Sequence, residues 1–194
     1  MTKTALIAVA NGTEEIEAVT IIDVLRRAGV EVKIASITAA HELQITGAHG
    51  IKLTADCSID DCANLDWDLI VVPGGMPGAE HLAESLVLDA LLRSQAAKGK
   101  LYAAICAAPA LVLGSKGLLK DKIATGHPMF QQNLEAKELN SESRVVVDGN
   151  CITSQGPGTS LDFALELVEQ LCGVVKREEV GSPMVLTTSA TAYY

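Results

Sequence analysis

A single cysteine, Cys106, interrupts the small-residue run AAICAAPA at residues 103–110. The run predicts a strand that ends at the cysteine and a helix that begins at Ala107, which would place the thiol at a sharp turn beside unpaired helix amides. Such amides favour the thiolate, so the pattern predicts a nucleophile with a pKa below the ~8.5 of a free thiol. The alternative is core packing, because cysteine is among the most buried residue types.

Three glutamates, Glu14, Glu15 and Glu17, crowd the start of the first predicted helix. Acidic side chains there complement the helix dipole, which accounts for two of them. Glu17 shares a helical face with Ile21 and Val24, so we predict a partly buried carboxyl with a raised pKa. While protonated, this carboxyl could donate a hydrogen bond to a thiolate. The spacing leaves Glu14 open as an alternative, because it also shares a face with apolar residues.

Two loops offer further groups for the same chemistry. His127 in TGHPMF is either an acid–base group or an ordinary loop histidine before a proline. Gly74 and Gly75 in VVPGG either present backbone amides to an oxyanion or form a tight turn. Both alternatives stay open on the residues alone.

Motifs for common cofactors are missing from the sequence. The turn VANGTEEIE lacks G-x-G-x-x-G, and no phosphate-binding P-loop motif occurs. The five cysteines form no C-x-x-C pair and have no histidines at zinc-ligand spacing. We therefore predict free thiols, no metal and no cofactor, and we interpret Cys57 and Cys62 as packing residues. The pattern assigns no role to Cys151 or Cys172.

The elements that must position these groups alternate along the chain. Short runs of β-branched residues predict strands at 4–10, 30–37, 69–75, 101–106, 144–149 and 151–154. Amphipathic stretches predict helices at 14–28, 80–97 and 159–172, with another just after Cys106. This alternation predicts a doubly wound α/β sandwich, with a mostly parallel sheet and helices on both faces. Residues 43–46 and 50–56 predict a small added hairpin.

The composition predicts one folded domain over residues 1–194, since 48% of the 194 residues are hydrophobic. The net charge of −9 makes nucleic acid an unfavourable partner. The longest apolar run, residues 101–114, is too short to cross a bilayer as a helix, and the N-terminus shows no signal-peptide pattern. We expect no membrane association and a cytoplasmic protein.

Five motifs in order resemble the ThiJ/PfpI superfamily, and within it the YajL-like branch. They are GTEEIEAV, VVPGG, AAICAAPA, TGHP and TSQGPGTS, and the resemblance runs from about residue 5 to residue 186. It implies a flavodoxin-like α/β sandwich whose reactive cysteine sits at a strand-to-helix turn. Carried over by motif position, the nucleophile falls on Cys106 and its protonated carboxyl partner on Glu17, in preference to Glu14.

The resemblance also implies supporting roles around the thiol. Gly75 and Ala107 would supply backbone amides to an oxyanion, and His127 matches a histidine found near the cysteine. Members of the family are usually homodimers, and Arg27 matches an arginine close to the dimer interface. We therefore expect a homodimer.

The sequence departs from the family pattern at three positions. His49 stands where the human member of the branch has an arginine near the thiol, and Gln155 replaces another arginine before GPGTS. These changes put an anion-binding role of the arginines in doubt. Ala107 after the cysteine differs from the context of the protease and amidotransferase branches, so peptidase or amidase activity is disfavoured.

The activity that the resemblance implies needs no cofactor. It is the conversion of α-oxoaldehydes such as methylglyoxal and glyoxal to hydroxy acids, or the repair of their early adducts on proteins, with protection against oxidative stress. A redox sensor or redox-regulated chaperone would use the same cysteine. A structural dimer with an inert, buried Cys106 is the third alternative.

Overall fold

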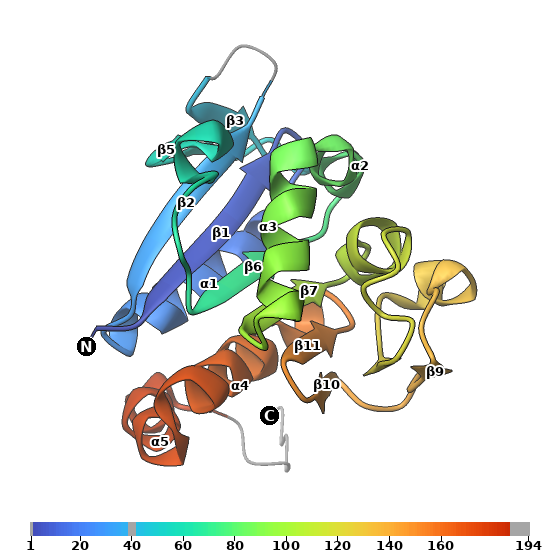
Figure 1. The fold of residues 1–194 in the computed structure, drawn as a ribbon. Coiled ribbons are helices and arrows are strands. Elements are labelled where there is room, and N and C mark those ends of the chain that lie inside the picture. Colours follow the sequence, from blue (N-terminus) through green and yellow to red (C-terminus); the bar gives the residue numbers. More distant parts are fainter. Residues whose placement is uncertain (1, 39–41, 187–194) are drawn as a thin grey trace.

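A computed structural model describes residues 2–38 and 42–186, and a seven-stranded sheet lies at its centre (Figure 1). The strand order is β10-β11-β7-β6-β1-β2-β5. Strand β10 runs antiparallel to β11, and the remaining neighbours are parallel. These strands are β1 (Thr4–Ala10), β2 (Glu31–Ile37), β5 (Cys57–Ser58), β6 (Leu69–Val72), β7 (Leu101–Ile105), β10 (Val145–Asp148) and β11 (Cys151–Ser154).

Helices cover both faces of this sheet. In Figure 1, α3 crosses in front of the sheet and α1 lies behind it, where α1 packs against α4. The α-helices are α1 (Glu15–Arg27), α2 (Gly78–Glu84), α3 (Leu86–Ala97), α4 (Ser160–Cys172) and α5 (Val174–Gly181). Short 3-10 helices are η1 (Ile59–Cys62), η3 (Pro128–Asn133), η4 (Pro157–Thr159) and η5 (Ser182–Met184), and η2 (Pro109–Gly114) is a π-helix.

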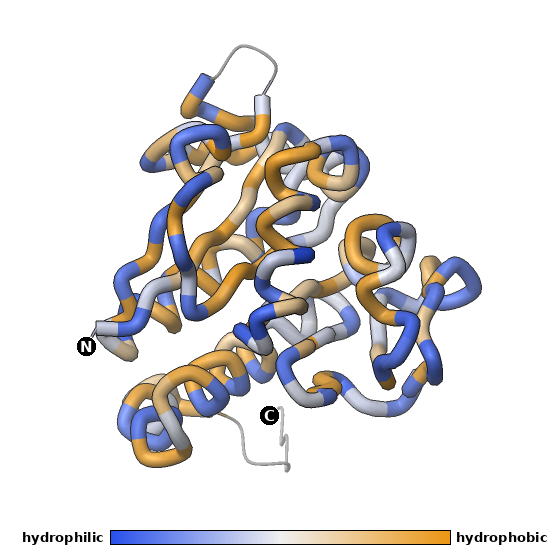
Figure 2. The backbone as a smooth tube through the Cα atoms, in the orientation of Figure 1, coloured by the Kyte–Doolittle hydropathy of each residue, from blue (hydrophilic) through white to orange (hydrophobic). Residues whose placement is uncertain are grey.

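Two apolar cores follow from the alternation of side chains along buried strands. Ile7 and Val9 of β1 face α1 and α4, whereas Leu6 and Ala8 face α2, α3 and η2. All four side chains are fully buried. Figure 2 shows the corresponding runs of hydrophobic residues along the central strands. The predicted flavodoxin-like α/β sandwich is therefore confirmed.

Outside the main sheet, β3 (Gln44–Thr46) and β4 (Lys52–Thr54) form the predicted antiparallel hairpin. Two short strands, β8 (Ile123–Ala124) and β9 (Glu138–Leu139), pair separately and were not predicted, nor were β5 and α5. Within the described residues, no helix combines the length and the apolar character needed to cross a membrane.

The single helix predicted over residues 80–97 is wrong. The segment forms two helices, because Ser85 adopts an extended backbone with ψ 114° between them. Its hydroxyl accepts a hydrogen bond from the Leu88 N–H at 3.2 Å, which is the arrangement of a helix N-cap. The helix predicted after Cys106 exists only as the short η2 segment.

Candidate active site

Cys106 lies directly after β7, where the chain turns toward η2. Its φ is 67°, a left-handed conformation that costs roughly 1–2 kcal/mol for a residue with a side chain. The Cys106 N–H donates to Ser154 O at 3.0 Å, and the His127 N–H donates to Cys106 O at 2.8 Å. These bonds fix the turn and leave the thiol half-buried beyond the carboxyl end of β7, the edge at which open α/β sheets bind ligands.

Two backbone amides contact the Cys106 sulfur. They belong to Gly75 and Ala107, and their hydrogen bonds act to lower the pKa of the thiol. Gly75 has a φ of 91°, and a Cβ at this position would lie 2.3 Å from Glu14 N. Only glycine fits so close an approach. The two predicted amide donors thus converge on the predicted nucleophile.

Glu17 reaches the same thiol from α1. Its side chain is fully buried, and its Oε2 accepts a hydrogen bond from the Gly74 N–H at 2.7 Å. The carboxyl also interacts with the Cys106 thiol, although Oε1 makes no well-aligned hydrogen bond among the described residues. Burial raises the pKa of Glu17 to about 7, despite the Gly74 and Cys106 hydrogen bonds. The predicted buried carboxyl with a raised pKa is confirmed.

Gly74 has a different role from the one that its motif suggests. Its amide binds the Glu17 carboxyl, so of the two candidate oxyanion donors in VVPGG only Gly75 contacts the sulfur. A Cβ on Gly74 would lie 2.6 Å from the Cβ of Cys106 and 3.0 Å from Glu17 Oε2. The missing side chain is therefore what allows the thiol and the carboxyl to meet.

The thiol pKa differs from the prediction. Burial and the charge on Glu17 raise the pKa of Cys106 to about 12, which outweighs the amides of Gly75 and Ala107. The expected value below ~8.5 is thus wrong while Glu17 is ionised, because two negative charges repel each other in one buried site. The thiolate forms at the lowest cost when Glu17 keeps the proton, so the two groups titrate as a pair.

The imidazole of His127 contacts two residues of its own loop. Its Nδ1 accepts a hydrogen bond from the Met129 N–H at 3.3 Å, and its ring packs edge-to-face against Phe130. Among the described residues, the imidazole makes no hydrogen bond to Cys106; the link between the two residues is the backbone bond described above. The structure therefore brings Glu17 onto the thiol and places His127 beside the turn that carries it.

His49 contacts Glu14, the N-cap of α1, and Glu15 at the start of this helix. Its Nδ1 lies 3.3 Å from Glu14 Oε2 and 3.1 Å from Glu15 Oε2. The hydrogen bond to Glu15 and the charge on Glu14 raise the pKa of His49. Burial acts to raise the pKa of Glu15, but hydrogen bonds from its own backbone and from the His49 and Ile51 amides lower it overall.

These three side chains place one possible ligand atom each within 4.8 Å of one another. Hydrogen bonds within the chain account for the arrangement: Glu15 Oε1 accepts from the N–H groups of His49 at 2.8 Å and Ile51 at 3.2 Å. Position alone did not show that Glu15 is buried, since acidic residues at a helix start are ordinarily solvated. Glu14, Glu15 and His49 thus form a cluster that is held by contacts within the chain.

The side chains of Gln155 and Arg27 are both held by contacts within the chain. The Gln155 side chain donates to Ser141 O at 2.8 Å, so it is held by the chain itself. Arg27 is exposed on α1 and pairs with Asp23 at 2.7 Å. The interface role of Arg27 stays a prediction.

The comparisons with known proteins agree with this fold. The DJ-1/PfpI family profile matches residues 3–170. The chain belongs to the DJ-1/PfpI family. It is 47% identical over 186 residues to the Arabidopsis thaliana protein DJ-1 homolog A, covering 95% of this chain and 47% of that protein. The chain thus spans about half the length of this relative.

Two other relatives match over nearly their whole length. One is the Caenorhabditis elegans glutathione-independent glyoxalase DJR-1.2, which is 34% identical over 185 residues. The match covers 95% of this chain and 97% of the C. elegans protein. The other is the solved structure of oxidized Toxoplasma gondii DJ-1, with a TM-score of 0.92 and 40% identity. That match covers 96% of this chain and 100% of the Toxoplasma chain.

Replacing Glu17 with glutamine is expected to stabilise the protein at alkaline pH. Below pH 4.5, the ordinary pKa of a glutamate, the Glu17 carboxyl is neutral in both the folded and the unfolded chain. Between pH 4.5 and about 7 the unfolded chain loses this proton more readily than the folded chain, so the carboxyl increasingly opposes folding. The full effect is about 3 kcal/mol at pH 8. The free energy of unfolding in urea should be larger for Glu17→Gln than for wild type by this amount at pH 8. Near pH 4 the two free energies should differ little. An equal difference at both pH values would contradict the prediction.

Proposed function

We propose that the chain is a cofactor-independent enzyme that uses Cys106 to act on α-oxoaldehydes, such as methylglyoxal and glyoxal, or on their early protein adducts. The observation that carries the proposal is the contact between a half-buried thiol and a fully buried carboxyl, with two backbone amides on the sulfur. A thiol and a carboxyl that exchange one proton provide a nucleophile and an acid together. The glyoxalase name of the C. elegans relative supports the same class of reaction.

The proposed reaction begins with the thiolate. Its sulfur bonds to the aldehyde carbon, the carbonyl oxygen becomes an oxyanion beside the Gly75 and Ala107 amides, and Glu17 gives that oxygen its proton. The Glu17 carboxylate then takes the proton on the same carbon and delivers it to the neighbouring carbon. The hydroxyl proton of the hemithioacetal passes to the oxygen of the neighbouring carbonyl. That carbonyl thereby becomes an alcohol, and the hemithioacetal becomes a thioester. Water cleaves the thioester, releases lactate or glycolate, and restores the thiol.

Redox sensing by the same thiol is the second proposed function, and a redox-regulated chaperone would be one form of it. The amides of Gly75 and Ala107 that reach the sulfur would also bind the oxygens of a sulfinate. The solved T. gondii relative is described as oxidized, which supports oxidation within this family. In this case oxidation of Cys106, rather than turnover, would protect the cell against oxidative stress.

One experiment separates the two functions. Lactate formation from methylglyoxal is measured without glutathione or added metal, and the mass of the Cys106 peptide is followed after treatment with hydroperoxide. Lactate formation would support the enzyme. Selective oxidation of Cys106 without lactate would reject the enzyme and support the sensor. We place either function in the cytoplasm, a proposal that the five free cysteines support.

We also propose a homodimer that forms through the outer face of α1. Ile16 and Val19 on this face are 57% and 47% exposed, and Arg27 lies on the same side of the helix. Leu25, on the opposite side of the same helix, is fully buried in the core. Adjacent exposed aliphatic side chains are typical of a surface that a partner covers.

The double variant Ile16→Glu/Val19→Glu is expected to be monomeric at micromolar concentrations, because unpaired charges would be buried in the interface. Sedimentation velocity measures the mass of the wild type and of the variant. Leu86→Glu is the matched control, since Leu86 is 81% exposed on α3, on the other face of the sheet. A monomeric wild type at the same concentration would refute the homodimer.

A further inference from the structure

Cys57 and Cys62 face each other at one edge of the sheet. Their sulfur atoms are 3.5 Å apart. Cys57 is half-buried in β5, whereas Cys62 is buried at the end of η1. Cys106 follows β7, and β6, β1 and β2 lie between β7 and β5 in the sheet. The pair is therefore separate from the proposed active site.

The local fold holds the two sulfurs together. Cys57 pairs with Ala35 of β2 in the parallel register, which fixes the start of the turn. Ser58 caps η1, and the Asp61 carboxylate accepts a hydrogen bond from the Ser58 N–H at 3.2 Å. The Cys62 thiol returns toward Ser58 O at 3.8 Å. A disulfide needs the sulfurs to approach to ~2.05 Å, which is a small movement within one short turn.

We propose that Cys57 and Cys62 form a second oxidation site, which a hydroperoxide converts to a reversible intramolecular disulfide. The Cys57 sulfur attacks the peroxide: an S–O bond forms, the O–O bond breaks, and the leaving oxygen departs with the thiol proton as water or an alcohol. The Cys62 sulfur then attacks the sulfenic acid, an S–S bond forms, and hydroxide leaves with the Cys62 proton as water. The two thiols lose the two electrons that the peroxide gains.

Burial assigns the order of the two steps. Cys57 is the sulfur that a peroxide in solution can reach, because Cys62 is only 1% exposed and packs in the same core as Trp67 and Leu88. Burial, with the neighbouring Cys57, also raises the pKa of Cys62 to about 12. The raised pKa makes Cys62 a poor first target for peroxide. Its role in the second step follows from position, because its sulfur lies 3.5 Å from the Cys57 sulfur on which the sulfenic acid would form.

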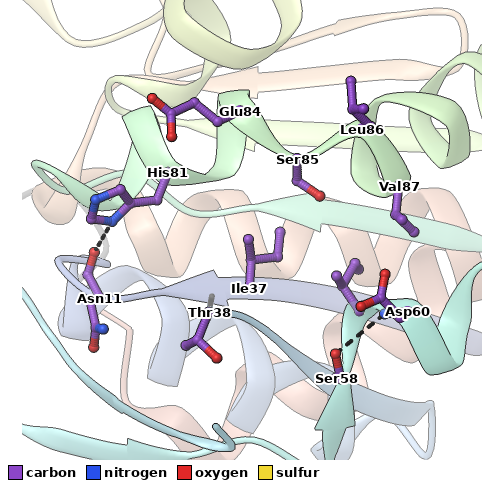
Figure 3. A pocket seen from close by; sticks show the side chains of 11 residues that line it. Asn11, Ile37, Thr38, Ser58, Asp60, His81, Glu84, Ser85, Leu86 and Val87 are labelled. Atoms are coloured by element: carbon purple, nitrogen blue, oxygen red, sulfur yellow. Dashed lines mark hydrogen bonds between the residues drawn. The ribbon is translucent and has the colours of Figure 1, made fainter. Parts of the chain in front are cut away.

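The disulfide would also fix one wall of a pocket. Ser58, Ile59 and Asp60, which lie between the two cysteines, line a cavity of about 570 Å³, and the wall opposite them includes Ser85 and Leu86 at the start of α3 (Figure 3). Closing the 57–62 loop reduces the freedom of this wall. Hydrogen exchange of the amides of residues 59–62 is therefore expected to slow on oxidation.

The test treats Cys106→Ser, which lacks the competing thiol, with one equivalent of hydrogen peroxide. Remaining thiols are blocked with N-ethylmaleimide, and tryptic peptides are weighed. Cys57 and Cys62 lie in one peptide, residues 53–93. After oxidation we expect this peptide to carry no N-ethylmaleimide on either cysteine, while half-buried Cys172 is still labelled. Reduction with dithiothreitol before the labelling should restore N-ethylmaleimide on both cysteines of the peptide. Full labelling of the peptide, or oxidation of Cys57 to a sulfinic acid, would overturn the proposal.

Cys62→Ser, made in the Cys106→Ser background so that the competing thiol is again absent, provides the second arm. Without its partner, Cys57 should stop at the sulfenic acid and react with dimedone, whereas the pair in Cys106→Ser should give little dimedone adduct. Equal dimedone labelling of the two proteins would argue against a resolving role for Cys62. A disulfide between two chains, seen as a doubled mass on a non-reducing gel, would also contradict the intramolecular bond.

Discussion

Cys106→Ser is expected to reduce lactate formation from methylglyoxal by at least ~10³-fold, because the variant has no thiolate to add to the aldehyde. The hydroxyl of serine fills nearly the same space, so the strained turn and the contacts of Glu17 should persist. A serine alcohol is a much weaker acid than a thiol. An ionised Glu17 beside it would further disfavour a negative charge on the serine oxygen in this buried site. The measurement is steady-state lactate formation at saturating methylglyoxal.

Cys172→Ser is the matched control. Cys172 is half-buried, as Cys106 is, but it lies at the end of α4 rather than beside Glu17. The activity of Cys172→Ser should remain within about twofold of wild type, because a conservative substitution away from the site changes little. Activity of Cys106→Ser within tenfold of wild type would remove the thiol from the mechanism and would leave the proposed enzyme without a nucleophile.

Glu17→Gln should lose turnover by at least ~100-fold, the usual effect of removing an acid–base group. Glutamine keeps a hydrogen-bond donor near the sulfur but cannot carry a proton between carbons. The charge on Glu17 helps to raise the pKa of Cys106, so the variant should have a lower thiol pKa and a more easily oxidised cysteine than wild type. Glu17→Ala should also lose turnover, and its thiol pKa should lie above that of the glutamine variant, because it has no donor.

Two measurements on these variants test the role of the carboxyl. Ultraviolet absorbance of the thiolate gives the thiol pKa, and lactate formation gives the turnover. A reactive thiolate with little turnover in Glu17→Gln is the expected combination. If this variant formed lactate at the wild-type rate, Glu17 would not be the proton carrier, and His127 would be the next group to replace.

Local sequence patterns predicted the long strands of the main sheet and the burial of Glu17. The strand at residues 4–10 was predicted with its observed ends, because a continuous β-branched and apolar run is typical of a strand buried on both faces. The burial of Glu17 followed from its position on the Ile21 face of α1. Both inferences depend on periodicity within one element, which the sequence displays directly.

Interactions between distant segments could not be predicted in the same way. The Gly74 amide meets Glu17 across 57 positions of the chain, and no local pattern links them. The thiol pKa depends on how deeply three segments bury one sulfur, so the helix position of Cys106 was an insufficient guide. The break at Ser85 shows the remaining limit, since one serine within an otherwise amphipathic stretch is compatible with either one helix or two.

The left-handed backbone at Cys106 bears on how this sequence can drift. Glycine would relieve the conformation at this position, and an uncharged side chain at position 17 would remove a buried carboxyl, so folding alone favours losing both groups. Selection for stability alone would therefore replace Cys106 and Glu17 while it preserved the residues of the surrounding sheet. A lineage that keeps both groups therefore keeps them at a cost in the stability of the fold.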